Sequence, residues 1–510
     1  MLSGEESKQR LREQRMNTPY EIIVGLEVHV QLQTQSKLFC ACPTTFGLEP
    51  NTATCPVCLG LPGALPVLNR AALDLALRAA TALHCVIPAT TRWDRKNYFY
   101  PDLPKGYQIS QYDQPIGGPG YLEIPTPEGG LRRIRIIRAH LEEDAGKLIH
   151  AGPSTLVDLN RAGTPLLEIV SQPELRSPEE ARLYLEEMAM LMREIGVSDC
   201  RMEQGSLRCD ANVNIRVGEA VTPIVEIKNL NSFRFLEQAI RYEAQRHYQH
   251  LQRDPSFRLG LRPKQTWGWD EQAGITRPQR EKEEAADYRY FPDPDLVPVQ
   301  IDEAQRQAAQ SAVGELPSAM RQRLVKQYGL SSYDVGVLLG MGRAGVAYFE
   351  AVARVAQDAK AACNWVTNPL AAVLKERQLS LQSPPIEAER LGGLIAAQQQ
   401  RGLNRQQAEA VFARMLAEPI DAQAAIAALG ITVVGDETVL LEAIRQAMAA
   451  HPKAVADYRG GKTAAANAIK GAVMRMLQGS ARPDVVERLL KAELDRPQGA
   501  TSEVDTPPSA

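Results

Sequence analysis

Residues 202–231, MEQGSLRCDANVNIRVGEAVTPIVEIKNLN, form the stretch that decides the fold. Between Ser206 and Arg216 polar residues stand at the even positions and apolar residues at the odd positions. Because side chains on a strand point to opposite faces with a period of two, this pattern predicts a strand with one apolar and one polar face. A second short strand, residues 225–229, alternates in the same way after a loop that contains Gly218 and Pro223.

The polar face of this strand has two interpretations. Many sheets keep one face in water, and a single polar face is most simply explained in that way. The residues here, however, are amides, arginines and an aspartate, without the threonine, glutamate and lysine mixture of a solvated surface. That composition also suits a face that lines a cleft for a polar ligand, and the segment alone leaves both interpretations open.

Further elements are predicted on both sides of this stretch. Hydrophobic periodicity and capping residues predict strands at 20–33, 121–124, 131–142, 155–159 and 166–171, and helices at 69–83, 177–195 and 232–252. From about residue 301 the pattern is helical. We therefore expect an α+β chain, in which a domain with a mainly antiparallel sheet precedes two all-helical domains. The expected divisions are a flexible extension at 1–18, then domains at 19–298, 299–384 and 385–495, and a disordered tail at 496–510.

Composition narrows the class of protein. The 510 residues carry a net charge of -3, which argues against a uniformly basic nucleic-acid binder but leaves room for a local basic patch. The N-terminus has no apolar segment typical of a signal peptide, and no apolar run reaches the ~18 residues of a membrane span. We expect a cytoplasmic protein without a membrane partner, whose eight cysteines are reduced.

Half of the cysteines lie in one short segment. Cys40 and Cys42 form one close pair, and Cys55 and Cys58 form a second pair. Two such pairs separated by a short loop predict a tetrahedral zinc site, and four ordinary buried thiols are the alternative. With four sulfur ligands no coordination position stays open, so the predicted zinc would stabilise the loop and take no part in catalysis.

Several acidic residues stand on the polar sides of predicted strands. Glu168 interrupts the apolar run 166–170, where a buried carboxylate without a partner would be costly. If the strands share one sheet, these acids converge on one basin, where hard divalent ions such as Mg²⁺ or Mn²⁺ would hold them together. The alternative for each residue alone is an exposed or ion-paired side chain. The candidate ligands are Glu27, His29, Glu142, Glu143, Glu168 and Asp210.

The usual phosphate-binding loops are not present in working form. The segment 460–463, GGKT, resembles the end of a P-loop, but the required first glycine is replaced by Ala456. The segment 340–345 matches a dinucleotide pattern, yet a predicted helix and not a strand precedes it. Any nucleotide chemistry would therefore use a less common architecture.

Two further segments could bind nucleotides or RNA. The loop 95–107 combines cations with aromatic rings, which suits a purine, a ribose or a single-stranded RNA end, and a rigid surface loop is the alternative. Between residues 453 and 482 six basic residues face a single aspartate, which suits phosphate-backbone contact, with a solvated helical face as the alternative. The candidate RNA contacts are Arg459, Lys462, Lys470 and Arg475.

These segments together resemble a known family, the B subunits of the aspartyl/glutamyl-tRNA amidotransferases (the GatB family). The resemblance runs from about Tyr20 to Leu494, with a tail-domain match at DYRGGKTAAANAIKGAVMRMLQGSARPDVVERLL. The matching motifs are IVGLEVHVQL, CPVCLGLPG, RKNYFYPDLPKGYQISQYD, HLEEDAGKLIH, NRAGTPLLEIVS, EQGSLRCDANV, VEIKNLNSFR and DYRYFPDPDL.

The resemblance implies a cradle domain that acts as kinase and transamidase, with a helical tail domain that binds tRNA. ATP would phosphorylate the side-chain carboxylate of Glu-tRNA(Gln) or Asp-tRNA(Asn), and ammonia would displace the phosphate. The implied partners are a glutaminase A subunit, a small C subunit and the tRNA. By resemblance the six candidate ligands hold Mg²⁺ and the four cysteines hold Zn²⁺. We expect ATP contacts from Lys96, Tyr98, Lys105, Arg208, Asn212 and Lys228.

Two rival hypotheses use the same residues. The first is a zinc-stabilised tRNA-binding adaptor without catalysis of its own. The second is a two-metal phosphodiesterase that uses the same acids. The sequence leaves open which of the two misacylated tRNAs is the substrate.

Overall fold

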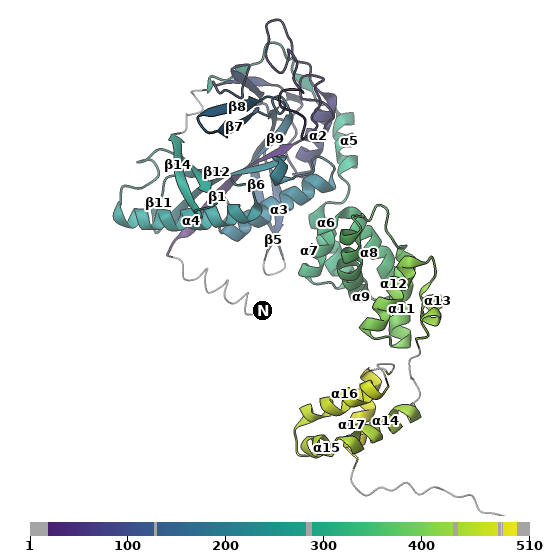
Figure 1. The fold of residues 1–510 in the computed structure, drawn as a ribbon. Coiled ribbons are helices and arrows are strands. Elements are labelled where there is room, and N and C mark those ends of the chain that lie inside the picture. Colours follow the sequence, from purple (N-terminus) through teal and green to yellow (C-terminus); the bar gives the residue numbers. More distant parts are fainter. Residues whose placement is uncertain are drawn as a thin grey trace, which may run out of the picture. The chain divides into compact units, whose positions relative to one another are not determined.

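The computed structural model describes residues 19–126, 130–281, 288–431, 437–477, 481 and 483–496. The predicted extension at 1–18 and almost all of the predicted tail at 496–510 lie outside these residues. Contacts within the chain divide it into two compact units, Met1–Gln322 and Arg323–Ala510 (Figure 1). Each unit is described by itself below.

A nine-stranded sheet organises the first unit. All neighbouring pairs are antiparallel except β12 and β13, which run parallel. In spatial order the strands are β14 (Ile275–Glu281), β13 (Gln265–Asp270), β12 (Val225–Lys228), β10 (Leu207–Val217), β1 (Glu21–Gln31), β9 (Pro165–Ser171), β6 (Leu131–Glu143) and β5 (Gly120–Pro125), and β11 (Ala220–Val221) pairs with β10.

Helices cover one face of this sheet. Alternate residues of β10 and β1 are buried and join the main apolar core, namely Leu207, Cys209, Ala211 and Val213 of β10 and Leu26 and Val28 of β1. Helices α2 (Arg70–Ala82), α3 (Pro178–Glu194) and α4 (Phe233–Arg253) supply the other half of that core, and Figure 1 shows α3 and α4 along the same side of the strands. Ser177 and Ser232 cap α3 and α4 by accepting backbone hydrogen bonds.

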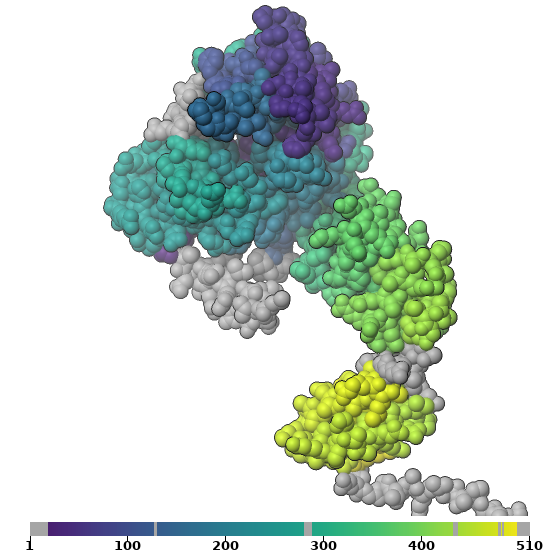
Figure 2. Space-filling model, viewed as in Figure 1, coloured from purple at the N-terminus to yellow at the C-terminus, as the bar shows by residue number. Residues whose placement is uncertain are grey.

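The first unit also contains short strands that do not belong to the nine-stranded sheet, and a long loop. The pair β7 (Lys147–Ala151) and β8 (Ser154–Asp158) forms a hairpin, and the loop after β1 carries the four clustered cysteines. Figure 2 shows this loop, in purple, beside the blue hairpin, and Asn51 Nδ2 donates a 3.0 Å hydrogen bond to the Val157 carbonyl. The remaining elements here are β2 (Thr90–Thr91), β3 (Asp94–Asn97), β4 (Tyr107–Ser110), β15 (Phe291–Pro292), β16 (Val299–Gln300) and α5 (Glu303–Val313).

The second unit is helical in its described residues. Helix α6 (Pro317–Tyr328) crosses from the first unit into the second. Residues 440–494 form a separate apolar cluster built by the last four helices. The helices are α7 (Ser332–Gly340), α8 (Gly342–Ala356), α9 (Ala359–Trp365), α10 (Ala371–Glu376), α11 (Ala388–Arg401), α12 (Arg405–Ala417), α13 (Ala422–Ala428), α14 (Glu437–Ala450), α15 (Pro452–Arg459), α16 (Ala466–Met476) and α17 (Pro483–Leu494).

The α+β fold class predicted from the sequence is confirmed. Each predicted strand and helix of the first domain is present within a few residues of its expected bounds. The rejection of a dinucleotide loop at 340–345 is also correct, since α7 and not a strand precedes it. Among the described residues no helix is both long and apolar enough to cross a membrane. The predicted domain boundaries at 298 and 384 stay predictions.

Candidate active site on the polar face of the sheet

Pairing of the central strands places polar side chains in one row across the sheet. Arg208 of β10 lies opposite His29 of β1, His29 lies opposite Glu168 of β9, and Glu168 lies opposite His140 of β6. Each strand contributes one member because the register fixes which residues face each other. We call the side of the sheet that carries this row the polar face, and it is the side away from the apolar core.

The first candidate metal group lies in this row. His29, Glu142 and Glu168 each offer a ligand atom, and these atoms lie within 4.8 Å of one another. His29 Nε2 is 3.3 Å from Glu168 Oε2, and His140 Nε2 is 3.4 Å from both Glu142 Oε2 and Glu168 Oε2. Two carboxylates and two imidazoles therefore meet in a partly buried cluster. The Ser110 hydroxyl donates a 2.8 Å hydrogen bond to Glu142.

Mutual attraction overcomes the cost of burial in this cluster. Burial opposes the charged forms of the four residues, but their contacts reverse its effect. Both imidazoles hold the pKa of Glu168 well below its usual value, and His140 also lowers the pKa of Glu142. In turn the two carboxylates raise the pKa of His140 to about 9, and Glu168 raises the pKa of His29. The carboxylates are thus ionised at neutral pH, which is the state that binds a divalent cation.

A second candidate group lies two residues along β1. Glu27 pairs in register with Asp210, and their carboxylates lie with that of Glu226 within 4.8 Å of one another. Asn212 Nδ2 donates a 2.8 Å hydrogen bond to Glu27, and Lys228 forms ion pairs with Asp210 and Glu226. Three carboxylates with one lysine form a second oxygen-rich group beside the first.

Glu143 is the predicted ligand that the structure does not bring into either group. The side chain of Glu143 pairs with Lys105 and accepts a 3.2 Å hydrogen bond from the Ile109 backbone N–H. Its neighbour Asp144 is buried and is held by Arg208 at 2.8 Å and by Gln31 at 2.7 Å. Of the predicted ATP contacts, Lys105 pairs with Glu143 and Arg208 pairs with Asp144, and both carboxylates follow directly after Glu142 of the first candidate group.

Lys96 and Tyr98 lie next to the first group, in a cluster of tyrosine rings. The Lys96 Nζ is 5.8 Å from the centre of the Tyr98 ring and 4.9 Å from that of Tyr288. Although burial favours the neutral amine, Glu142, Tyr290 and Glu168 raise the pKa of Lys96 above its usual value. Lys96 is therefore a permanent, half-buried cation beside the carboxylates, in a position suited to an anionic ligand.

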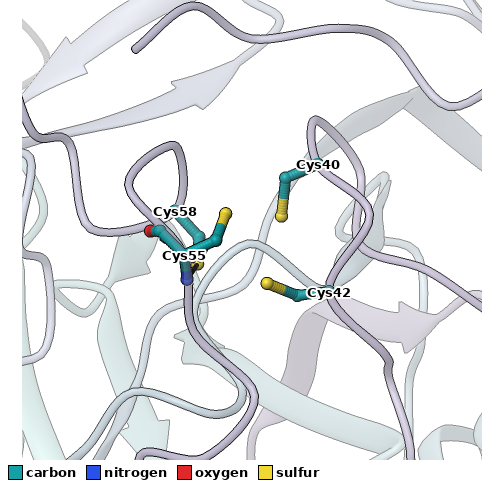
Figure 3. Close-up of side chains that lie close together, drawn as sticks. All are labelled: Cys40, Cys42, Cys55 and Cys58. Carbon is teal, nitrogen blue, oxygen red and sulfur yellow. Dashed lines mark hydrogen bonds between the residues drawn. The ribbon is translucent and has the colours of Figure 1, made fainter.

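The four clustered cysteines converge as the sequence predicts. Figure 3 shows the Cys40, Cys42, Cys55 and Cys58 side chains turned toward one another, and their Sγ atoms lie within 4.8 Å. A hydrogen bond from Cys40 lowers the pKa of Cys58 to about 4, while burial raises that of Cys42 to about 11. Four sulfur ligands at this spacing fit a closed tetrahedral zinc site.

The predicted RNA contacts lie around α15 and α16. Arg459, Lys462 and Arg475 are exposed, and Lys470 is half-buried. Lys462 Nζ is 3.1 Å from Asp457, Lys470 pairs with Glu487, and Arg459 Nε donates to the Leu494 carbonyl at 3.2 Å. The local excess of positive charge is therefore partly neutralised within the tail helices.

Sequence reasoning missed His140, Glu226, Tyr288 and Tyr290. Two of these had a local signal, since His140 stands two residues before Glu142, and Glu226 stands two residues before Lys228 on its strand. Tyr288 and Tyr290 had none, because only the pairing of β15 with β3 brings residues 288–292 beside Lys96. Long-range pairing of this kind is not visible in a local pattern.

Comparison with known proteins assigns the family. A GatB/GatE catalytic domain model matches residues 22–307, and a GatB domain model matches residues 347–494. The B subunit of the aspartyl/glutamyl-tRNA(Asn/Gln) amidotransferase of Rhodopirellula baltica is 48% identical over 482 residues, which cover 92% of this chain and 96% of that protein. The chain belongs to the GatB family.

Other GatB-family relatives match over nearly the same length. The B subunit of the Carboxydothermus hydrogenoformans amidotransferase is 44% identical over 93% of this chain and 99% of its own. That of Moorella thermoacetica is 45% identical over 93% of this chain and 100% of its own. Both candidate metal groups and the four cysteines lie inside the segment matched by the GatB/GatE catalytic domain, and the four basic tail residues lie inside the second segment.

Proposed function

We propose that this chain is the kinase and transamidase subunit of a tRNA-dependent amidotransferase. Its substrates are Glu-tRNA(Gln), Asp-tRNA(Asn) or both, and its products are Gln-tRNA(Gln) and Asn-tRNA(Asn). The observation that carries the proposal is the polar face, where two candidate ligand groups lie beside Lys96, Arg208 and Lys228. All of these residues lie inside the segment matched by the family's catalytic domain. The reaction needs this combination because ATP and the substrate carboxylate are both anionic.

The proposed reaction has two steps. A side-chain carboxylate oxygen of the aminoacyl-tRNA attacks the γ-phosphorus of ATP, and ADP leaves. Ammonia then attacks the acyl carbon, phosphate leaves, and a proton is lost to give the amide. Phosphoryl transfer depends on positioning and charge neutralisation more than on covalent help, so the first step needs no general base.

The donor sets on the polar face fit Mg²⁺. His29, Glu142 and Glu168 would hold one ion, and Glu27, Asp210 and Glu226 would hold a second ion. When bound, Mg²⁺ would neutralise phosphate charge and orient the phosphate groups.

The lysines beside these groups would act on the substrates directly. Lys96 and Lys228 would attract the phosphates, and each already lies beside carboxylates that hold it in place. Arg208 would act indirectly, by fixing Asp144 next to the ligand groups. The rings of Tyr98 and Tyr288 would shield Lys96 from water and so strengthen its attraction for an anion.

The other assignments concern structure and partners. The four cysteines would hold Zn²⁺, and Arg459, Lys462, Lys470 and Arg475 would contact the tRNA backbone. The glutaminase A subunit would deliver ammonia, and a small C subunit would complete a heterotrimer in the cytoplasm. Support for these partners is the name that the relatives share, that of an amidotransferase B subunit.

The decisive experiment uses Glu168→Gln in the purified complex with the A and C subunits. ATP-dependent amidation of Glu-tRNA(Gln) and of Asp-tRNA(Asn) is measured separately, together with tRNA binding and tRNA integrity. We expect amidation to fall by about 100-fold or more, the scale of losing one electrostatic stabiliser, with tRNA binding unchanged. Glu123→Gln serves as the matched control, since Glu123 pairs with Arg133 on the edge of the sheet.

Each rival hypothesis gives a different result in this assay. An adaptor would leave amidation intact in Glu168→Gln, because a separate subunit would carry the chemistry. A phosphodiesterase would shorten the tRNA in the wild-type reaction. Either result would refute the proposed function, and the two substrates tested side by side show which misacylated tRNA is used.

A further inference from the structure

Lys37 is a fully buried lysine beside the four cysteines. Its side chain has 0% relative exposure. The Nζ donates to the Ala53 carbonyl at 2.8 Å, to the Leu159 carbonyl at 3.4 Å and to Cys58 Sγ at 3.6 Å. The three N–H donors of the ammonium thus have three acceptors.

Only one of these acceptors, the Cys58 sulfur, can carry a countercharge for the buried ammonium. Removal of an ammonium from water is costly unless a countercharge is present. Two of the three acceptors are neutral carbonyls, and no carboxylate in the described part of the chain forms an ion pair with Lys37. A zinc ion with four thiolates would carry a net charge of about -2, so a loaded centre would give Lys37 a stronger countercharge than a single thiolate.

We propose that Lys37 is the outer-sphere cation of the four-cysteine centre and joins this centre to the turn 159–164. The inference rests on the zinc assignment made in the proposed function. The Lys37 ammonium donates a hydrogen bond to Cys58 Sγ and offsets part of the negative charge of the tetrathiolate. Outer-sphere donors of this kind orient the ligands and tune the metal.

The turn 159–164 lies between the cysteine loop and the polar face. Leu38 N–H donates to the Gly163 carbonyl at 2.9 Å, and Gly163 N–H donates to the Asp144 carbonyl at 2.9 Å. Gly163 has a φ of +86°, and a Cβ atom built there would lie 3.5 Å from Lys37 Cδ and 3.6 Å from Cys58 Cβ. The turn therefore packs directly on both residues, and any larger side chain would be strained.

The same turn leads into the strand that carries Glu168. The strand β9 begins at Pro165, directly after Thr164, whose carbonyl accepts a 2.8 Å hydrogen bond from Asp144 N–H. Lys37 thus contacts the cysteine centre with one N–H and the start of this turn, at Leu159, with another. The role that follows is positional, since no atom of Lys37 is exposed to a substrate.

The test compares zinc binding by the full-length wild-type chain with that by Lys37→Met, which keeps an apolar stem but removes the charge. Zinc affinity is measured by competition with a chromogenic chelator, and we expect it to fall by about 10- to 100-fold. Lys147→Met, at an exposed lysine of β7, is the matched control and should bind zinc as the wild type does.

A spectroscopic measurement distinguishes the outer-sphere role from a general loss of stability. In the cobalt-loaded chain, loss of the hydrogen bond to Cys58 should move the sulfur-to-metal charge-transfer band to longer wavelength. Hydrogen exchange at 159–164 should also become faster in the metal-loaded variant than in the metal-loaded wild type.

Each outcome decides between the assignments. Zinc affinity and charge-transfer band both unchanged in Lys37→Met would overturn the role of Lys37 and leave the zinc site intact. A wild-type chain that binds no zinc would overturn both. Should Lys37→Met fail to fold, Lys37→Gln provides the test, because a neutral donor should shift the band while the metal stays bound, and an unshifted band would overturn the inference.

Discussion

His140 lies between two carboxylates of the first candidate metal group, and a prediction about protein stability follows from this position. In metal-free buffer, His140→Leu leaves the buried Glu142 and the half-buried Glu168 with less compensating charge. We expect a loss of about 3 kcal/mol in the free energy of unfolding, measured by urea denaturation with a chelator present. Added Mg²⁺ should restore part of this loss, because the cation replaces the imidazolium between the carboxylates. Equal stability of variant and wild type would contradict the charge balance described here.

A second residue-scale prediction concerns Glu243, which is fully buried in α4. Burial opposes its ionisation, but hydrogen bonds from His247 and Arg246 lower the pKa of Glu243 to about 2. Thr276 Oγ1 adds a 2.7 Å hydrogen bond to the same carboxylate. A depressed carboxyl pKa stabilises the fold above the unfolded-state value of about 4.3, and this stabilisation is lost as the pH falls toward 2.

Acid titration of Glu243→Gln tests this account. At pH 7 the variant should be less stable than the wild type by about 3 kcal/mol, the equivalent of the pKa shift. The difference should shrink steadily between about pH 5 and pH 2, as urea midpoints followed by circular dichroism would show. A difference that stays constant over this range would mean that the carboxylate charge does not contribute.

At the scale of elements, adjacent residues of β9 should have opposite effects. Ile169 is buried in the apolar core, whereas Glu168 points to the polar face. We expect Ile169→Ala to lower the free energy of unfolding by about 2–5 kcal/mol. At temperatures well below the melting temperature of the variant, its amidation rate should stay within a few-fold of the wild-type rate. Thermal unfolding and initial rates measured on the same preparation would check this. Loss of activity without loss of stability would show that the strand does not hold Glu168 independently of the core.

The sequence allowed the central strands to be predicted because each alternates over many residues. The strands β1 and β10 have clear period-two patterns and were located to within two residues. The strands β13 and β14 were not predicted, since the first is a short aromatic segment and the second contains Pro278. Of the two, only β14 lies at the edge of the sheet, where a strand can contain proline.

The candidate site followed from the sequence only in part. Acidic residues on predicted strands could be named, but their grouping depends on strand order, and nothing local places β9 between β1 and β6. For the same reason the sequence predicts both Glu142 and Glu143 as ligands of the metal ion. The structure separates them, because successive side chains of β6 point to opposite sides and Glu143 pairs with Lys105.

At the scale of the whole molecule, the basic residues of the tail predict a salt-dependent contribution to tRNA binding. Lys462 and Arg475 are exposed and do not belong to the tail's apolar cluster. The double variant Lys462→Ala with Arg475→Ala should weaken tRNA binding about 3- to 10-fold. The slope of the logarithm of the binding constant against the logarithm of the salt concentration should become shallower by about 1 for each phosphate that is no longer neutralised. Filter binding at several salt concentrations measures both quantities. Arg70→Ala, at an exposed residue of α2, is the control.

The apolar cluster at residues 440–494 has a practical consequence for the whole chain. The side chains that form it come from one continuous segment, and among the described residues none comes from the sheet domain. A segment that forms its own apolar core can be exchanged for the corresponding segment of a relative, because the exchange leaves the core of the sheet domain intact. Chimeras that carry the corresponding segment of a relative should therefore fold, and they would show whether the choice between tRNA(Gln) and tRNA(Asn) travels with the tail or stays with the sheet.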